Sequence, residues 1–273
     1  RIIGDKLAAM WGQQIIVENR GGGGGAAGMA AVARAAPDGY TLAMLSTSPV
    51  AITPVLRKDP GYNIESEFVP VALVCGGPML IAVTPTLPAQ TLSELVRLAK
   101  AQPGKLNLAL SNLHNIPHFA AELFSSATDI QLYPVAFNGS TASVAAAMSG
   151  EAHVIMDGAG ALASQVRSGR LRALAITSQK RMSGWENVPT VSETIPDFEV
   201  LGWLGLLAPA GVAPAIVERI NRDVTAVARL PDVVTRFEQL GNIPITGSVK
   251  YAEEFMRAER VRWGKVIRDM GVQ

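Results

Sequence analysis

The sequence predicts an α/β fold in which two lobes each contain a mainly parallel sheet with flanking helices. Short apolar stretches of strand character alternate with glycine- or serine-rich turns and with helical stretches over most of the first 207 residues. Alternation on this scale is typical of parallel sheets covered by helices on both faces. The length of 273 residues is near the limit for one hydrophobic core, so it accommodates two lobes of ordinary size.

The expected elements follow one another in a regular order. Strands are predicted at Gln14–Glu18, Thr41–Leu45, Val69–Val74, Leu80–Val83, Leu106–Leu110, Leu132–Phe137, His153–Met156, Leu171–Thr177, Val200–Leu207 and Ile243–Ile245. Helices are predicted at Ala27–Ala36, Thr91–Ala101, His118–Ser126, Thr141–Met148, Leu162–Ser168, Ala213–Leu230, Asp232–Leu240 and Tyr251–Met270. Thr91 and Glu94 form a capping-box pattern, and the Gly-Gly-Pro sequence at 76–78 is expected to break an extended stretch.

The last third of the chain is mostly helical, which suggests that it returns to the first lobe. We expect the chain to cross between lobes near 80–85 and near 204–208. The predicted division is residues 1–83 with 208–273 as lobe 1 and 84–207 as lobe 2, with a ligand cleft between them. The chain opens at Arg1 in a pattern that resembles the middle of a helix, so we expect an upstream segment in the complete protein.

Composition excludes several classes of function. Lys and Arg number 24 against 23 Asp and Glu, and this balance argues against a surface for nucleic acid or anionic membrane. Cys75 is the single cysteine, so an internal disulfide or thiolate metal cluster is not expected, and its apolar surroundings predict a small buried hydrophobe. The longest apolar stretch, 68–83, is too short and too interrupted to span a bilayer.

The turns that follow the predicted strands are the best candidates for a binding site. In open parallel sheets ligands bind beyond the carboxyl ends of the strands, where turns lead into helix N-termini whose N–H groups favour anions. The clearest example is 137–141, where Gly139 allows close approach of the backbone and Ser140 precedes an alanine-rich helix. Ser140 could equally serve only as the N-cap of that helix, and the two interpretations stay open.

Two motifs suggest cofactors or metals only weakly. Gly23-x-Gly25-x-x-Gly28 matches the dinucleotide fingerprint, but the expected acidic residue after the next strand is missing. His114, His118 and Glu122 have helical metal-ligand spacing, but Pro117 is expected to start the helix and leave His114 outside it. We therefore expect neither a cofactor nor a metal.

No catalytic set is visible in the sequence. A G-x-S-x-G motif and paired carboxylates are absent, and no histidine lies beside a recognisable nucleophile. Asp157 ends a predicted strand at the turn edge and could bind a ligand amine, cap the next helix or act as a base. The chain offers binding groups, and we predict no enzymatic activity.

An ordered set of motifs runs through essentially the whole chain. Its members are Ile15–Arg20 with the following glycines, Ala35–Leu42, Pro103–Asn107, Pro117–Phe124, Asn138–Ser140, Gly169–Ala175, Asn187–Val191, Gly205–Gly211 and Trp263–Ile267. In this order the motifs resemble one family, the Bug-type (TctC-like) extracytoplasmic receptors of tripartite tricarboxylate transporters.

The resemblance implies a type II periplasmic-binding-protein fold that closes on a carboxylated ligand and delivers it to a membrane permease. It also implies a periplasmic location, with a signal peptide upstream, and we expect a monomer. The alternatives are a two-lobed α/β enzyme acting on an organic acid and a ligand-responsive sensor. The resemblance allows a mono- or dicarboxylate, an aromatic acid or an amino acid as the ligand. The implied ligand-binding residues are Ser46, Thr47, Ser48, Ser111, Asn112, His114, Asn115, Phe137, Asn138, Gly139, Ser140, Asp157 and Trp203.

Two departures from the family pattern concern the ligand. Leu113, His114, Asn115 and Ile116 stand where the family usually has glycines and a serine, which should narrow the pocket. His114 could add a charge-assisted contact to a distal carboxylate. The family's first strand and its Pro-Gly-Gly loop would precede Arg1, so we expect part of the site to lie upstream of this sequence.

Overall fold

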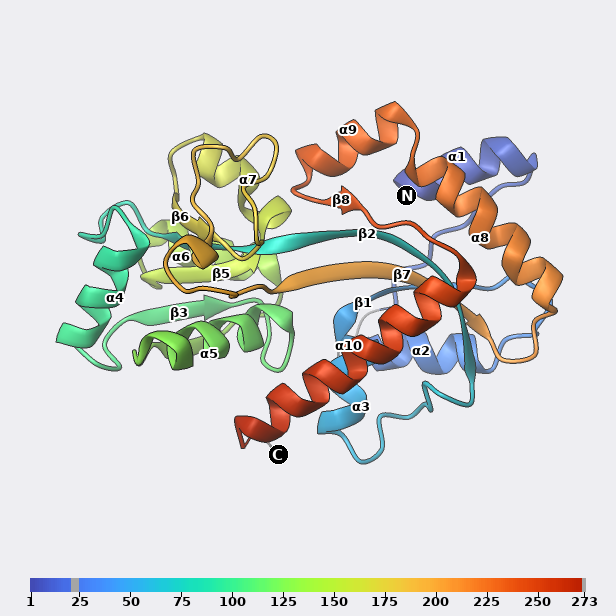
Figure 1. The fold of residues 1–273 in the computed structure, drawn as a ribbon, viewed down its shortest axis with the longest axis horizontal. Helices are drawn as coiled ribbons and strands as arrows, with labels where there is room; N and C mark the ends of the chain where they lie inside the picture. Colours follow the sequence, from blue (N-terminus) through green and yellow to red (C-terminus); the bar gives the residue numbers. More distant parts are fainter. Residues whose placement is uncertain (21–24, 272–273) are drawn as a thin grey trace. The chain divides into compact units, whose positions relative to one another are not determined.

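The computed structural model describes residues 1–20 and 25–271, which form an α/β fold with a mixed sheet (Figure 1). The chain divides into two compact units. Unit 1 contains Arg1–Gly76, Trp203–Phe237 and Ile243–Gln273, and unit 2 contains Gly77–Gly202 and Glu238–Asn242. The functional roles of the two predicted lobes and the ligand cleft stay predictions. The predicted lobes comprise residues 1–83 with 208–273 and residues 84–207.

Unit 1 combines helices from both ends of the chain with a small sheet. Its helices are α1 (Ile2–Trp11), α2 (Ala26–Ala33), the π-helical turn η2 (Ser48–Ile52), α3 (Thr53–Leu56), α8 (Pro214–Ala228), most of α9 (Pro231–Gln239) and α10 (Val249–Asp269). Strand β1 (Ala43–Ser46) pairs antiparallel with β7 (Leu201–Pro209), which neighbours β2 (Phe68–Val83). The short β8 (Ile243–Pro244) pairs antiparallel with β2.

A buried carboxylate joins the sheet of unit 1 to its last helix. Glu259 on α10 is 8% exposed, and its Oε2 accepts hydrogen bonds from the indole nitrogens of Trp203 at 3.0 Å and Trp263 at 3.1 Å. Arg262 lies 3.4 Å from the other carboxylate oxygen. Two neutral donors and one cation thus satisfy a charge that would otherwise be costly to bury.

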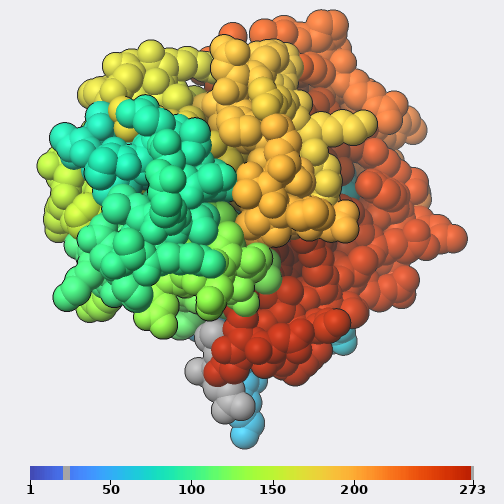
Figure 2. Space-filling model, turned by 60° about the vertical axis from the view of Figure 1, so that its left-hand side comes forward, coloured from blue at the N-terminus to red at the C-terminus, as the bar shows by residue number. Residues whose placement is uncertain are grey.

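Unit 2 contains the parallel part of the sheet. Its strands β3 (Asn107–Leu110), β4 (Tyr133–Ala136), β5 (Val154–Gly158) and β6 (Arg172–Ile176) alternate with α4 (Leu92–Ala101), α5 (Ile116–Thr128), α6 (Ser140–Ser149) and α7 (Ala159–Arg167), and the 3₁₀ turn η3 (Val191–Glu193) follows. Strand β3 lies between β4 and β5 and is parallel to both, whereas β2 pairs antiparallel with β5 and β6. Figure 2 shows the surface of unit 2 that the teal and green part of the chain forms, from α4 to α5.

Three expectations need correction. The stretch Gln14–Glu18 is not a strand, and Ile16 within it is 77% exposed. The Gly-Gly-Pro sequence does not interrupt β2, because the β8 ladder ends at Gly76 and those with β5 and β6 begin at Met79 and Leu80. The missing N–H of the proline therefore falls between the β8 ladder and the ladders with β5 and β6. The sheet is mixed rather than mainly parallel, since the long strands pair antiparallel with most of their neighbours.

Other local expectations are confirmed. Thr91 caps α4 by accepting a hydrogen bond from the Glu94 N–H. Cys75 is 3% exposed, and burial raises its pKa to about 12, which makes it an unreactive apolar group. None of the described helices combines the length and the apolar character that a bilayer span requires.

Candidate functional site at the carboxyl edge of the parallel strands

The turns after β3, β4 and β5 meet at one edge of the unit 2 sheet, because the three strands are parallel neighbours. Hydrogen bonds connect the first two turns directly. The Phe137 N–H donates to Leu110 O at 2.9 Å, and the Gly139 N–H donates to Ser111 O at 2.9 Å. The structure therefore brings together the predicted residues of three turns: Ser111, Asn112, His114, Asn115, Phe137, Asn138, Gly139, Ser140 and Asp157.

Two helices begin at this edge without a side-chain cap. The N-cap of α6 is Gly139, with φ 91°, and the N-cap of α7 is Gly158. Neither cap residue supplies a side-chain hydrogen bond, and neither first turn contains an acidic residue. Ser140 and Asp157 are thus not the N-caps that the sequence allowed. The first N–H groups of both helices have no intrahelical acceptor and carry the positive end of the helix dipole.

Asp157 is a buried titratable residue at this edge. The residue is 7% exposed, and its Oδ1 accepts the Gly158 N–H at 2.8 Å. Burial raises the pKa of the Asp157 carboxyl, while the nearby Ser140 hydroxyl, the Gly158 N–H and the Ser111 hydroxyl partly oppose that rise. The second oxygen, Oδ2, is buried and accepts no hydrogen bond from any described residue. A buried acceptor without a partner is costly, which makes it a natural contact for a ligand or bound water.

The loop at 111–115 is held by its own side chains. Asn115 caps α5 by accepting the His118 N–H at 3.1 Å, and its Nδ2 donates to Ser111 Oγ at 3.2 Å. Asn112 Oδ1 accepts the Leu113 N–H at 2.9 Å. These amides shape the loop, and ligand contacts by Asn112 and Asn115 stay predictions.

The remaining predicted site residues belong to unit 1. Ser46 is exposed at the end of β1, and Ser48 is half-buried at the start of η2. Thr47 is 1% exposed, and its hydroxyl accepts the Trp203 backbone N–H at 3.1 Å. Trp203 is 2% exposed, and Glu259 already binds its indole nitrogen. Ligand contacts by these four residues stay predictions.

The weak metal and cofactor motifs can also be placed. Helix α5 begins at Ile116, so His114 lies in the preceding loop as expected. No cluster of metal-ligating side chains is found among the described residues. Gly23 of the dinucleotide-like motif lies outside the described residues, whereas Gly25 is the N-cap of α2.

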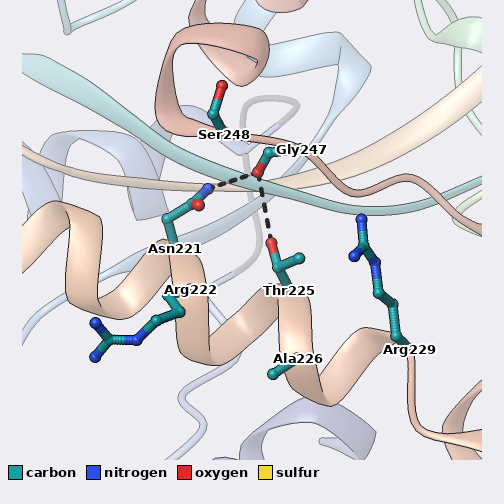
Figure 3. Close-up of a pocket in the computed structure, with 7 residues that line it drawn as sticks. All are labelled: Asn221, Arg222, Thr225, Ala226, Arg229, Gly247 and Ser248. Carbon is teal, nitrogen blue, oxygen red and sulfur yellow. Dashed lines mark hydrogen bonds between the residues drawn. The ribbon is translucent and has the colours of Figure 1, made fainter.

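A surface pocket of about 470 Å³ in unit 1 lies between α8 and the segment that leads into α10 (Figure 3). Asn221 Nδ2 donates to Val71 O at 2.8 Å and to Gly247 O at 3.1 Å, and the Thr225 hydroxyl approaches the same Gly247 oxygen at 3.5 Å. Arg229 Nε donates to the Thr246 hydroxyl at 3.0 Å. These hydrogen bonds hold the segment before α10 against α8. We therefore interpret the pocket as part of the packing between them and not as a ligand site.

Comparison with known proteins identifies the family. The model of the tripartite tricarboxylate transporter family receptor, TctC, matches residues 1–272. The chain belongs to this receptor family. A curated relative, Protein BugT of Bordetella pertussis, is 32% identical over 275 residues, covering 100% of this chain and 84% of that protein.

Solved structures of similar receptors share the fold. Rpa4515 of R. palustris with adipate is 28% identical with a TM-score of 0.94, and the match covers 99% of this chain and 91% of that one. MatC of Rhodopseudomonas palustris with bound malate is 28% identical with a TM-score of 0.87, covering 98% and 92%. The predicted family, the α/β periplasmic-binding fold and the prediction of a receptor rather than an enzyme are therefore confirmed.

Two features of this receptor's edge escaped sequence reasoning. The glycine N-caps of α6 and α7 were hidden because serine and aspartate beside them are the commoner caps. The contact between His118 and the loop was also missed, although the i, i+4 spacing of His114 and His118 was visible. That spacing suggested a metal site, whereas the structure shows a hydrogen bond from backbone to ring.

Proposed function

We propose that this receptor binds a small carboxylate at the edge formed by the turns after β3, β4 and β5, and delivers it to a tripartite-type permease. The observation that supports this best is the buried, unpartnered Asp157 Oδ2 beside two helix N-termini without side-chain caps. The N–H groups of the first turn of α6, from Ser140 onward, bind the ligand carboxylate. Asp157 accepts a hydrogen bond from a ligand hydroxyl or amine, or from a water that bridges to the ligand.

A ligand with two polar ends fits this division of roles. One carboxylate occupies the helix N-termini, and a second polar group reaches Asp157 or the exposed residues 112–114 of the loop. The similar receptors with adipate and with malate support a dicarboxylate. Malate carries a hydroxyl that can donate to Asp157, whereas adipate would need a bridging water.

The proposed cellular role follows from the family. The match to a transporter receptor supports capture of solute for a membrane permease, and the similar chain described as periplasmic binding protein BugD supports a periplasmic location. We propose that the receptor acts as a monomer whose two units close on the ligand, with residues 46–48 of unit 1 completing the site.

A thermal-shift panel tests ligand binding. We expect at least one small mono- or dicarboxylate to stabilise the protein, by about 2.7 kcal/mol at roughly 100 times its dissociation constant. The matched control is the corresponding neutral diamide, which lacks the charge that helix N-termini favour and should give no shift. If diamides and carboxylates stabilise the protein equally, or if no carboxylate stabilises it, the proposed function is wrong.

A further inference from the structure

His118 is a buried imidazole that contacts the candidate binding loop through one defined ring nitrogen. Its side chain lies at the third position of α5 and is 8% exposed as a residue. Its Nδ1 accepts the backbone N–H of His114 at 3.0 Å. Because an accepting nitrogen carries no proton, the neutral ring must hold its proton on Nε2.

The other side of the ring supports the same tautomer. Nε2 lies 3.6 Å from Glu122 Oε1, one turn further along α5. The hydrogen bond from His118 lowers the pKa of the Glu122 carboxyl, so this group stays ionised and attracts the Nε2 proton. The second titratable group that faces the ring is His114, whose ring centroid is 5.7 Å away. The imidazole is thus held between a carboxylate and a backbone donor.

The residue that donates to His118 has an unusual backbone. His114 has φ 60°, in the left-handed region that non-glycine residues rarely occupy. Such a conformation persists only where surrounding contacts impose it. The hydrogen bond to Nδ1 is a contact of this kind, since relaxation of His114 to negative φ would turn its N–H away from the ring. Ser111 and Asn115 lie on either side of His114 in the loop and are joined by a hydrogen bond from Asn115 Nδ2 to Ser111 Oγ at 3.2 Å, so we expect their positions to depend on the conformation of His114.

We propose that His118 is a positioning residue: through Nδ1 it holds the loop at 111–115 in its ligand-binding conformation, and protonation of that nitrogen releases the loop. A doubly protonated ring has N–H groups on both nitrogens, so it would face the His114 N–H with another donor. Ligand affinity then falls in mildly acidic solution, where histidines generally acquire their second proton. The inference rests on the proposed function, because the loop must contact the ligand for its geometry to affect affinity.

Two substitutions separate the acceptor from the bulk of the ring. In His118→Asn, the amide Oδ1 takes the place of Nδ1 as an acceptor but does not titrate, whereas His118→Phe keeps a ring without an acceptor. We expect wild-type affinity for the best carboxylate to fall about tenfold between pH 7.5 and pH 5.5. The affinity of His118→Asn should stay within about twofold over this range, and His118→Phe should bind weakly at both pH values.

His153 provides a matched control. Its Nδ1 accepts the Asn107 N–H at 2.9 Å, which is the same kind of bond at the opposite, amino end of β3 and β5. His153→Asn should therefore keep the wild-type pH profile of binding. Because Asp157 is present in all of these proteins, a difference between the two asparagine variants isolates the ring at 118. Equal pH profiles for His118→Asn and His153→Asn would overturn the inference.

A measurement without ligand tests the same bond independently. Hydrogen exchange of the His114 amide in the wild-type protein, corrected for intrinsic rates, should show protection at pH 7.5 that is lost by about pH 5.5. An unprotected amide at pH 7.5, or protection that persists at pH 5.5, would refute the role of Nδ1 even if a variant failed to fold. A third outcome is that the His114 amide loses its protection between pH 7.5 and pH 5.5 but the protein binds no carboxylate. That outcome would support the role of Nδ1 and contradict only the proposed function.

Discussion

Replacing Asp157 by asparagine is expected to weaken binding of the preferred carboxylate by about tenfold or more, the usual loss when a charged acceptor of a buried hydrogen bond is removed. Oδ2 of Asp157 is buried and has no partner among the described residues, so its hydrogen bond is left for the ligand or a bridging water. Isothermal calorimetry at pH 7.5 measures the change. Asparagine keeps the shape of the side chain and removes the charge.

The same substitution should stabilise the unliganded protein at neutral pH. Burial raises the pKa of the Asp157 carboxyl in the folded state above its value of about 3.9 in the unfolded chain. The protonated carboxyl therefore contributes to stability in full when the pH is below the unfolded-state pKa. This contribution is lost as the pH rises through the folded-state pKa. At neutral pH the ionised group opposes folding, and asparagine removes that cost. The advantage of Asp157→Asn over wild type should therefore shrink as the pH is lowered towards 4.

Asp223→Asn is the matched control for both measurements. Asp223 belongs to unit 1, where it accepts the Trp11 indole N–H at 2.8 Å and therefore has a partner. This change should leave ligand affinity unaltered and should not raise the free energy of unfolding. Unchanged affinity in Asp157→Asn would show that Asp157 does not contact the ligand.

Replacing Gly160 by alanine is expected to lower the free energy of unfolding by about 3 kcal/mol, at the upper end of the cost of overpacking. A Cβ atom at Gly160, near the start of α7, would overlap the carbonyl oxygen of Leu240, and the neighbouring backbone carbon would be 2.8 Å away. The obstacle is main chain, so no rotamer change can relieve it. The segment 238–242, which unit 2 holds at this point, would have to move.

Gly158→Ala is the control for this prediction, two residues earlier in the same turn. A Cβ atom there would meet nothing within 4 Å, and its φ of −53° suits any residue. Its stability should stay within about 0.5 kcal/mol of wild type in urea unfolding. Equal stability of Gly160→Ala and Gly158→Ala would show that α7 does not approach Leu240 as closely as the structure indicates. Gly139 is unsuitable for such a test, because its φ of 91° strains any substitution.

Local sequence patterns predicted most elements of unit 2 because each depends on neighbours along the chain. The capping pattern at Thr91, the start of α5 near Pro117 and the strand–turn–helix sequence around Gly139 all reappear in the structure. Patterns that depend on distant partners were less reliable. The apolar stretch at Gln14–Glu18 has strand composition but pairs with no strand among the described residues. Strand β2 passes through Gly76–Pro78, where its ladder with β8 ends before its ladder with β5 begins.

The sequence by itself determined the family, the α/β class and the absence of a visible catalytic set, and it predicted the turns where a ligand should bind. Only the tertiary structure decided the chemistry of that edge. Burial of Asp157 with one oxygen unpartnered arises where strands and turns from different parts of the chain meet. The glycine caps of α6 and α7 and the acceptance of the His114 N–H by His118 depend on backbone conformations that this packing selects. Solvation and hydrogen bonding at such a point depend on which backbone groups converge in space, and no local pattern records that convergence.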